Sequence, residues 1–256
     1  HLVCGRLAAR HFLAHRMSRF AFLGWKGLRF SDAREQAFVS ALREDGYSCA
    51  VYRAPVTTMQ EYLDDNVQRE RFVLPADRRA ISRWISSLPK PVGVFCANDL
   101  RAWQLNAICA ELGLSVPGDV AILGADNDSV PCLFTNPTLS SVDTDAIGTG
   151  RAAAETLDAL MRAAPHERSA KPVLVNPIGV ECRESTMVYS VDPPWLAETL
   201  RFIHENVARA LLASEVAEFV HRSYVTLENA FREKLGTTVQ NVIMNSRLER
   251  AEHLLR

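Results

Sequence analysis

Four residues that suit a hydroxylated ligand stand at or shortly after the ends of apolar runs: Trp25, Arg34, Asn98 and Asp126. The runs FAFLG, VGVFC and VAILG have the length and composition of buried strands. Ligands of open parallel sheets bind beyond the carboxyl ends of the strands, where such residues would meet. Guanidinium, amide and carboxylate groups pair with hydroxyls, and an aromatic ring covers an apolar C–H face. The pattern therefore predicts a sugar-binding site.

Each of these residues also has an alternative role. Asp99 directly precedes a helical pattern and is expected to cap that helix, which leaves Asn98 as the ligand group. Trp25 could pack in the core instead of stacking on a ligand. Arg34 could pair with an acidic neighbour on a solvated helix face.

An enzyme that uses Asp126 as nucleophile or base is a further alternative. Asp126-Asn127-Asp128 also has the D-x-D spacing of a metal-binding pair, but no other carboxylate cluster accompanies it. The sequence has no glycine-rich phosphate loop and no G-x-S-x-G motif. We therefore expect no catalytic residues, no metal and no cofactor.

Apolar strands alternate with helical patterns along most of the chain, which is typical of a parallel sheet covered on both faces. The expected strands are residues 20–24, 48–52, 92–96, 120–124, 173–175 and 178–182. The expected helices are residues 2–15, 77–88, 99–112 and 145–161, and one between Asp32 and Gly46. This part is predicted to be an α/β domain.

After Asp192-Pro193-Pro194 the pattern changes to closely spaced helices, expected over residues 194–208, 214–220, 223–235 and 239–255. Proline disfavours helix in the residue before it and suits a linker. We therefore divide the chain into an α/β domain of residues 1–190 and an all-α domain of residues 191–256. Gly236 is expected to end the third of these helices.

The second and third helices of this tail have the lengths and the short break of a helix-turn-helix, whose second helix enters the DNA major groove. Ser223 is a natural N-cap for that second helix. The candidate DNA contacts are Ser223, Tyr224, Thr226, Asn229 and Arg232. Any small helical hairpin shows this pattern, so the spacing alone does not establish DNA binding.

Composition restricts the other possibilities. The chain is 48% hydrophobic with a formal net charge of -1, so no overall basicity points to nucleic acid, and no apolar run is long enough to span a bilayer. The six cysteines have no C-x-x-C spacing and are expected to be reduced, as in the cytoplasm. Because the chain opens at His1 inside a helical pattern and stops at Arg256 as a helix finishes, we expect a fragment that is incomplete at both ends.

The run CANDLRAWQLNAICAELGLSVPGDVAILGADND, with NPTLSSVD and CREST, resembles the sugar-binding domain of the lactose/galactose repressor family over residues 1–187. The resemblance implies a fold similar to periplasmic sugar-binding proteins, in which two α/β lobes close on the ligand, with the first lobe incomplete here. It implies that Arg34, Asn98 and Asp126 contact the sugar, whereas Trp25 matches more loosely. Some ligand contacts of that family come from the absent strands, so weak sugar binding by this fragment is expected.

SYVTLENAFREKLG followed by RLERAEHLL resembles the first helix-turn-helix and connecting helix of the arabinose-regulator family of activators. The whole chain is similar to xylose-responsive activators, which join these two parts in this order. The resemblance implies a cytoplasmic, sugar-responsive activator of pentose utilisation genes, with xylose as effector, that binds double-stranded DNA as a homodimer. A second helix-turn-helix is expected after Arg256.

The sequence departs from the arabinose-regulator pattern at the turn and on the second helix. His221 stands at the tight-turn glycine position, where a positive φ would strain it. Phe219 replaces a usually small residue, and Tyr224 stands where arginine is frequent. Because Glu228 and Glu233 are acidic, weak attraction to DNA phosphates is expected.

A solute-binding protein for sugar transport is the rival interpretation. The α/β part alone permits this function. The helical tail and the lack of an export signal argue against it, and secretion would expose six cysteines to oxidation.

Overall fold

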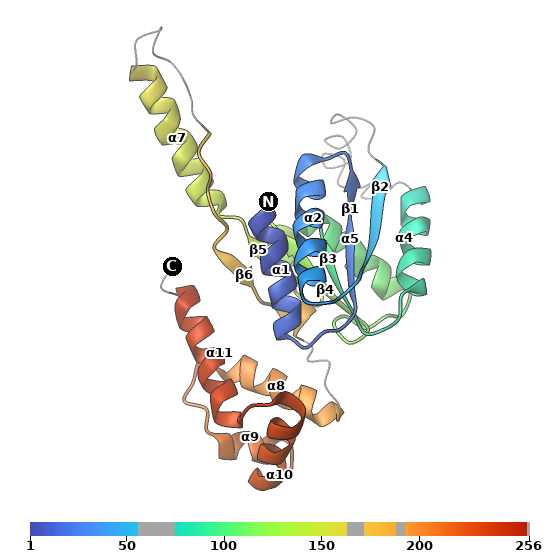
Figure 1. Cartoon of the computed structure of the whole chain (residues 1–256), viewed down its shortest axis with the longest axis vertical. Coiled ribbons are helices and arrows are strands. Elements are labelled where there is room, and N and C mark those ends of the chain that lie inside the picture. The colour runs from blue at the N-terminus through green and yellow to red at the C-terminus, as the bar shows by residue number, and fades with distance from the viewer. Residues whose placement is uncertain (56–74, 163–171, 188–192, 255–256) are drawn as a thin grey trace. The chain divides into compact units, whose positions relative to one another are not determined.

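A six-stranded sheet organises the first of two units into which the chain divides (Figure 1). The computed structural model describes residues 1–55, 75–162, 172–187 and 193–254. The first unit comprises residues 1–12 and 18–186, and the second comprises residues 13–17 and 187–256. Asp192, at the linker expected from the sequence, lies outside the described residues.

The strand order of the sheet is β2-β1-β3-β4-β5-β6. All neighbouring strands are parallel except β5 and β6, which are antiparallel. The strands are β1 (Phe20–Lys26), β2 (Cys49–Pro55), β3 (Val92–Cys96), β4 (Val120–Ala125), β5 (Ser140–Asp143) and β6 (Gly179–Glu181). Every residue of β3 and β4 is buried, as expected for the central strands of a sheet covered on both faces. The carboxyl ends of β1, β3 and β4 consequently lie beside one another.

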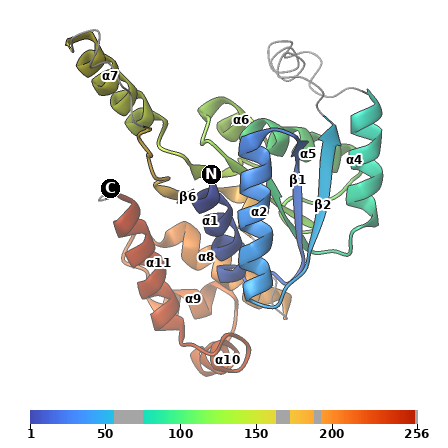
Figure 2. The same ribbon diagram turned by 45° about the horizontal axis from the view of Figure 1, so that its top comes forward.

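Helices cover both faces of the sheet (Figures 1 and 2). One face carries α1 (Leu2–Ala14) and α2 (Arg29–Glu44), and the other carries α4 (Pro75–Ser87) and α5 (Asp99–Glu111). Successive side chains of β1 point to opposite faces of the sheet. The ring of Phe20 lies 6.4 Å from that of Phe12 of α1, whereas Leu23 shares a buried cluster with Ile81 of α4 and Leu105 of α5.

Several elements differ from the expectations. The strand β5 and a short helix at Ser129–Leu133 were not predicted from the sequence. The helix that Asp32 was expected to cap begins at Arg29, with Leu28 as its N-cap. Residues 173–175 form no strand, and Val173 and Leu174 are 61% and 90% exposed. Their β-branched and apolar composition favours a strand only where a neighbouring strand offers backbone partners, and the sheet ends at β6. The remaining elements among the described residues of this unit are α6 (Ser129–Leu133), α7 (Ala146–Arg162) and the short 3-10 helix η2 (Glu184–Thr186).

The regular elements described in the second unit are helices: α8 (Pro194–Asn206), α9 (Ala213–Phe219), α10 (Tyr224–Ala230), the π-helical turn η3 (Phe231–Leu235) and α11 (Val239–Leu254). Apolar residues of all of them form a separate core that includes Leu200, Val216, Leu227, Phe231 and Ile243. Gly236 ends η3 in the left-handed conformation (φ 66°), as the sequence predicted. None of the described helices is long and apolar enough to cross a membrane.

Candidate functional site

Asp126 occupies the turn that follows β4, in a strained backbone conformation. Its φ is 111°, and that of the next residue, Asn127, is 55°. The N–H of Asp126 donates to the Val142 carbonyl of β5 (2.9 Å). Positive φ is uncommon for residues other than glycine, and strain of this kind gathers at functional sites. The Asp126 side chain is 45% exposed at this edge of the sheet.

Arg34 of α2 connects the ends of two central strands. Its Nη2 donates to Asp126 Oδ1 (2.6 Å), beyond β4, and its Nη1 donates to the Ala97 carbonyl (2.5 Å), beyond β3. The Arg34 side chain is only 3% exposed, so this ion pair has one buried and one half-exposed partner. Arg34 and Asp126, predicted from the sequence as ligand residues, therefore lie together.

The alternative that placed Arg34 on a solvated helix face is wrong. Its acidic neighbour Glu35 instead accepts two hydrogen bonds, of 2.7 and 2.5 Å, from Arg53 of β2. The reason is the helical period: Arg34 shares a face of α2 with Phe38, one turn further on. Phe38 is fully buried, so Arg34 points inward as well.

The N-cap of α5 is Asn98, and the expectation that Asp99 caps this helix was wrong. Asn98 Oδ1 accepts from the backbone N–H of Arg101 (3.0 Å). Asp99 is the first residue inside the helix, and its carboxyl accepts instead from Ser141 Oγ (2.5 Å) and from the Asp128 N–H (2.8 Å). Both residues therefore stabilise the strand-end loops, and Asn98 lies directly after the Ala97 carbonyl that Arg34 binds.

Asp99 is a buried carboxyl with an unusual pKa. Burial raises the pKa of Asp99 to about 6, although its hydrogen bonds from Ser141 and Asp128 oppose the shift. Gly124 of β4 packs against this carboxyl, because a Cβ on Gly124 would lie 2.1 Å from Asp99 Oδ1 and 3.1 Å from its Cα. The end of β4, which directly precedes Asp126, is thus packed closely against the start of α5.

Trp25, near the end of β1, is 7% exposed. The Arg101 guanidinium lies over its ring at 4.4 Å from the centroid, and the ring of Phe30 meets it edge-on at 6.1 Å. One face of the indole is therefore covered by a cation from the same unit. Stacking of a sugar on Trp25 would have to use the remaining ring surface.

One buried donor of Arg34 has no hydrogen-bond acceptor among the residues that the structure describes. This atom is Nε, the guanidinium nitrogen that bonds neither Ala97 nor Asp126. Leaving a buried polar group unpaired costs about 1–3 kcal/mol, so an oxygen placed beside it would be bound favourably. With the Asp126 carboxylate as acceptor and Arg34 as donor, this edge of the sheet can bind neighbouring hydroxyl groups.

The two carboxylates of Asp126-Asn127-Asp128 have separate partners. Asp128 caps α6 by accepting from the Val130 N–H (3.0 Å), whereas Asp126 binds the arginine of α2. Asn127 Oδ1 accepts from Arg183 Nη2 (2.7 Å). The D-x-D spacing is therefore explained by contacts that stabilise the loop.

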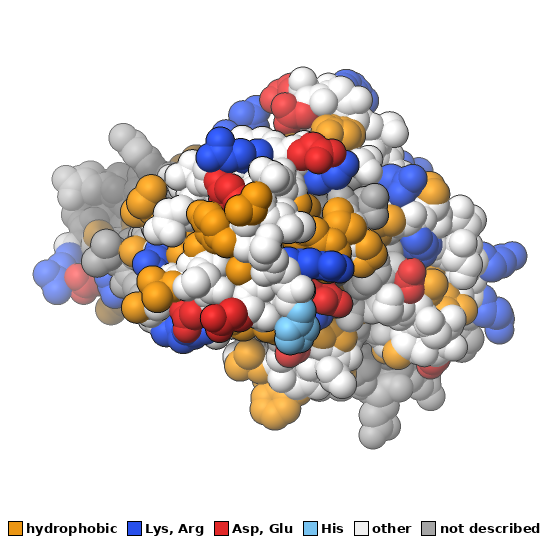
Figure 3. All heavy atoms as spheres, turned by 90° about the horizontal axis from the view of Figure 1, so that it is seen from below, with side chains coloured by type: hydrophobic (Ala, Val, Ile, Leu, Met, Phe, Trp, Pro, Cys, Tyr) orange, Lys and Arg blue, Asp and Glu red, His pale blue; other side chains and the backbone are white. Residues whose placement is uncertain are grey.

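In the second unit, α10 presents its predicted face to solvent. Ser223 is the N-cap, because its Oγ accepts from the Thr226 N–H (3.1 Å). The candidate DNA contacts Ser223, Tyr224, Thr226, Asn229 and Arg232 are all exposed. Exposed hydrophobic side chains of this unit include Leu212 and Val225, which are 62% and 66% exposed. Figure 3, a view from below, shows hydrophobic side chains between charged ones.

The turn between α9 and α10 has the strain predicted for it. His221 has a φ of 51°, a conformation that suits glycine. Phe219, two residues before His221, is accommodated by stacking on Phe202 of α8, with ring centroids 4.0 Å apart and planes 10° apart. The sequence departure at Phe219 thus adds an aromatic contact between α8 and α9.

Glu228 of α10 is committed to a structural contact. Its Oε2 accepts from the Val239 N–H (3.3 Å), at the start of α11. Its Oε1 accepts from Arg232 Nε (3.1 Å), and the Glu228 side chain is 15% exposed. The carboxylate therefore stabilises the N-terminus of α11 and engages one of the candidate DNA contacts.

Comparison with known proteins assigns the family. The family described as periplasmic binding protein-like domain matches residues 9–186, more than half of the chain. The chain belongs to this family. Its parallel sheet with helices on both faces accounts for most of the matched residues.

Several relatives match beyond the periplasmic binding protein-like domain. A xylose operon regulatory protein of Haemophilus influenzae is 25% identical over 252 residues, which covers 97% of this chain and 62% of the relative. That of Escherichia coli K12 is 28% identical over 248 residues, covering 96% and 60%. A structure of the xylose-binding transcription activator xylR aligns with a TM-score of 0.61 and 26% identity, covering 98% and 63%. The chain thus spans about three fifths of the length of these three relatives.

Sequence reasoning missed three residues beside the candidate site of the periplasmic binding protein-like domain: Phe30, Asp77 and Arg101. Phe30 lies between Trp25 and the Arg34 guanidinium, whose central carbon is 5.5 Å from the Phe30 ring centroid. Asp77 Oδ2 accepts from Arg101 Nη1 (2.8 Å). The only sequence signal for Arg101 was its position in the first turn of a helix that directly follows a strand.

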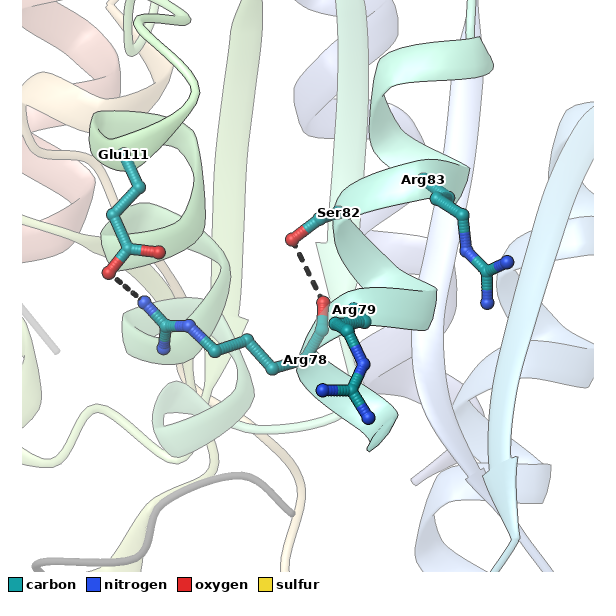
Figure 4. Close-up of a pocket in the computed structure, with 5 residues that line it drawn as sticks. All are labelled: Arg78, Arg79, Ser82, Arg83 and Glu111. Carbon is teal, nitrogen blue, oxygen red and sulfur yellow. Dashed lines mark hydrogen bonds and ion pairs between the residues drawn. The ribbon is translucent and has the colours of Figure 1, made fainter. Parts of the chain in front are cut away.

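A surface depression of about 510 Å³ lies elsewhere, between α4 and α5. It is lined by Arg78, Arg79, Ser82, Arg83 and Glu111 (Figure 4). Arg78 forms an ion pair with Glu111 across it, and Ser82 Oγ donates to the Arg78 carbonyl (2.9 Å). None of the predicted ligand residues lines this depression, so it is distinct from the candidate site.

Proposed function

We propose that this chain is part of a sugar-responsive, DNA-binding transcriptional regulator. The observation that carries the proposal is the match along 97% of the chain to a protein named xylose operon regulatory protein. That match runs through the sheet domain and through the helices that follow it. In this proposal residues 1–190 bind the effector and residues 191–256 form a helix-turn-helix domain. The protein has no catalytic step, and it acts in the cytoplasm as a homodimer.

The effector in this proposal is an aldose, with D-xylose as the first choice because of the relatives' names. Asp126 accepts hydrogen bonds from its hydroxyls, and Arg34 donates to them through Nε. Asn98 lies beyond the end of the neighbouring strand β3, and Trp25 contributes apolar surface. A site of this kind discriminates against analogues that lack a hydroxyl, because its buried polar groups would then be left unpaired.

The DNA contacts in this proposal are made by α10, through Ser223, Tyr224, Thr226, Asn229 and Arg232. Tyr224, Asn229 and Arg232 offer hydrogen-bond donors, and all are exposed. We expect this single helix-turn-helix to bind DNA with modest affinity, because Glu228 already accepts a hydrogen bond from Arg232. Specificity then depends on polar contacts to base edges more than on phosphate attraction.

Sugar and DNA binding are coupled in this proposal by a population shift. The sugar favours one arrangement of the protein because only that arrangement makes all the sugar contacts. Binding free energies are linked reciprocally, so operator DNA must tighten sugar binding by the same factor by which sugar tightens DNA binding. A sugar affinity that operator DNA leaves unchanged would contradict the coupling.

Calorimetric titration with D-xylose tests the sugar site, using the longest natural protein that carries this sequence. Asp126→Asn keeps an acceptor for Arg34 but removes the charge. Hydrogen bonds to charged groups contribute about 1.5–3 kcal/mol, so we expect roughly 10- to 100-fold weaker binding. Asp158→Asn, in an exposed carboxylate paired with Arg162 on α7, is the matched control and should bind as the parent does. Equal affinity of the two variants would refute the assigned site.

Fluorescence anisotropy with duplex DNA from the regulated promoter tests the helical domain. Asn229→Ala should weaken binding to the specific duplex more than binding to random duplex, because it removes a base-reading amide. Asn241→Ala, an exposed asparagine in the first turn of α11, is the control. If Asn229→Ala and Asn241→Ala behave alike on both duplexes, α10 is not the reading helix.

A further inference from the structure

Arg101 is a buried cation at the carboxyl edge of the sheet. Its side chain is 2% exposed, and its guanidinium lies over the Trp25 ring at 4.4 Å. Both hydrogen-bonding positions of Nη1 are used: one bond goes to Asp77 Oδ2 (2.8 Å) and the other to Gln104 Oε1 (2.9 Å). Stacking and two hydrogen bonds thus orient the plane of the guanidinium.

The opposite side of the same guanidinium is unpaired. Nε and Nη2 of Arg101 are buried and have no acceptor among the residues that the structure describes. These two nitrogens form one edge of the planar group, with parallel N–H bonds that match two neighbouring oxygens. Buried polar groups are rarely left unsatisfied, so the edge is suited to binding a pair of acceptors.

This edge is connected to the candidate sugar site by an aromatic pair. The Arg101 guanidinium lies over the Trp25 ring. The ring centroids of Trp25 and Phe30 are 6.1 Å apart, and the Arg34 guanidinium carbon lies 5.5 Å from the centroid of Phe30. Arg34 also has an unpaired buried Nε. Two arginines from opposite faces of the sheet, on α2 and α5, therefore flank one aromatic pair with unpaired donors on each.

We propose that the Nε–Nη2 edge of Arg101 is a second contact surface for the effector and binds two adjacent hydroxyl oxygens. The inference rests on the proposed sugar-binding function and adds a residue that determines which sugars fit. Asp77, which binds the opposite side of the guanidinium, has a side chain that is 16% exposed. Tyr52 Oη donates to Asp77 Oδ1 (2.9 Å) and fixes that carboxylate in place.

The local charge favours a neutral sugar over an anionic one. The Arg101 cation is already paired with the Asp77 carboxylate, so the pair has no net charge with which to attract a carboxylate or a phosphate. An edge of two neutralised N–H donors suits vicinal hydroxyls, which accept hydrogen bonds without adding charge. Uronic acids and sugar phosphates are therefore expected to bind less well than the parent aldose.

The test is a coupling experiment between Arg101 and the hydroxyls of the sugar, on the longest natural protein that carries this sequence. Arg101→Lys keeps the cation for Asp77 but removes the two-nitrogen edge. Affinities for D-xylose and for its monodeoxy analogues, each lacking one ring hydroxyl, are measured by calorimetry for both proteins. Arg222→Lys is the matched control, because Arg222 also lies over an indole, that of Trp195, at 5.8 Å.

We expect Arg101→Lys to weaken D-xylose binding roughly 10- to 100-fold. For analogues that lack one of two adjacent hydroxyls the same substitution should cost much less, because the contact is already lost. An equal effect on every analogue would indicate a structural role and overturn the proposal, as would no effect on D-xylose. If the parent protein binds none of these sugars, the proposed function itself fails.

A measurement on the unsubstituted protein covers the case in which Arg101→Lys does not fold. The Arg101 Nε–H resonance can be identified in ¹⁵N-labelled protein by its contact with the Trp25 ring protons. D-xylose should shift this resonance and slow its exchange with water. An Nε–H signal that is unchanged when the sugar saturates the protein would overturn the proposal.

Discussion

The buried carboxyl of Asp99 makes the stability of the sheet domain depend on pH. Its pKa is about 6 in the folded chain, against 3.8 for an ordinary aspartate. Because the folded state binds the proton more tightly, this group contributes stability that is complete below about pH 3.8 and is lost as the pH rises through 6. The sign is opposite to that of a carboxylate held in a salt bridge.

The magnitude follows from the two pKa values. At about pH 7.5 the carboxyl is ionised in both states, whereas at about pH 5 it is mostly protonated when folded and ionised when unfolded. With 1.36 kcal/mol for each pKa unit, the free energy of unfolding should gain about 1.4 kcal/mol between these two pH values from Asp99 alone. Other groups also titrate in this range, so the comparison has to be made against a variant.

Asp99→Asn is that variant. Its side-chain oxygen can still accept a hydrogen bond from the Asp128 N–H, which donates to Asp99 at 2.8 Å. The asparagine amide does not ionise, so it binds no proton in this pH range. Urea unfolding at the two pH values, in a Trp195→Phe background so that the fluorescence reports on the sheet domain, gives the free energies. The parent should gain about 1.4 kcal/mol more than Asp99→Asn on acidification. Equal gains in the two proteins would refute the assignment of a raised pKa to Asp99.

Three further predictions concern stability. His221→Gly should stabilise the helical unit by about 0.5–1 kcal/mol, because relief of left-handed strain exceeds the entropy cost of glycine; a lower urea midpoint for this unit would contradict it. Gly124→Ala should destabilise the sheet domain by about 1–3 kcal/mol, since its Cβ would overlap Asp99, and denaturation at neutral pH measures this. Glu228→Ala should cost the helical unit about 1 kcal/mol by exposing the start of α11, whereas Glu228→Gln, which keeps an acceptor, should cost less; equal losses in thermal denaturation would argue against the capping role.

The strands β1, β3 and β4 could be predicted because each contains a continuous apolar run, whereas β5, with the sequence SSVD, has no such run and was not predicted. VGVFC became β3 with the expected limits, and β4 extends only one residue beyond the expected range. Their polar flanks could be placed at one edge by topology alone, and Arg34 and Asp126 do meet there. Such predictions succeed where consecutive apolar residues mark the segments that are buried, because apolar burial is the dominant favourable term in folding.

The contacts within the site could not be predicted in the same way. Asn98 and Asp99 are both good capping residues, and only the helix start decides which of them caps and which is buried. The inward direction of Arg34 follows from the helical period that it shares with the buried Phe38. Its partners, Ala97 and Asp126, are distant in sequence, so these contacts could not be predicted. Arg101 was missed because its partners, Trp25 and Asp77, are distant in sequence and meet only in the folded chain.

The double engagement of Glu228 limits how the helical unit could change. A mutation that removed this negative charge to favour a duplex would also loosen the helix that follows α10, since Val239 relies on the same carboxylate. Stronger attraction to nucleic acid is therefore more accessible through new cations at other exposed positions, such as Tyr224, than through the loss of this acid.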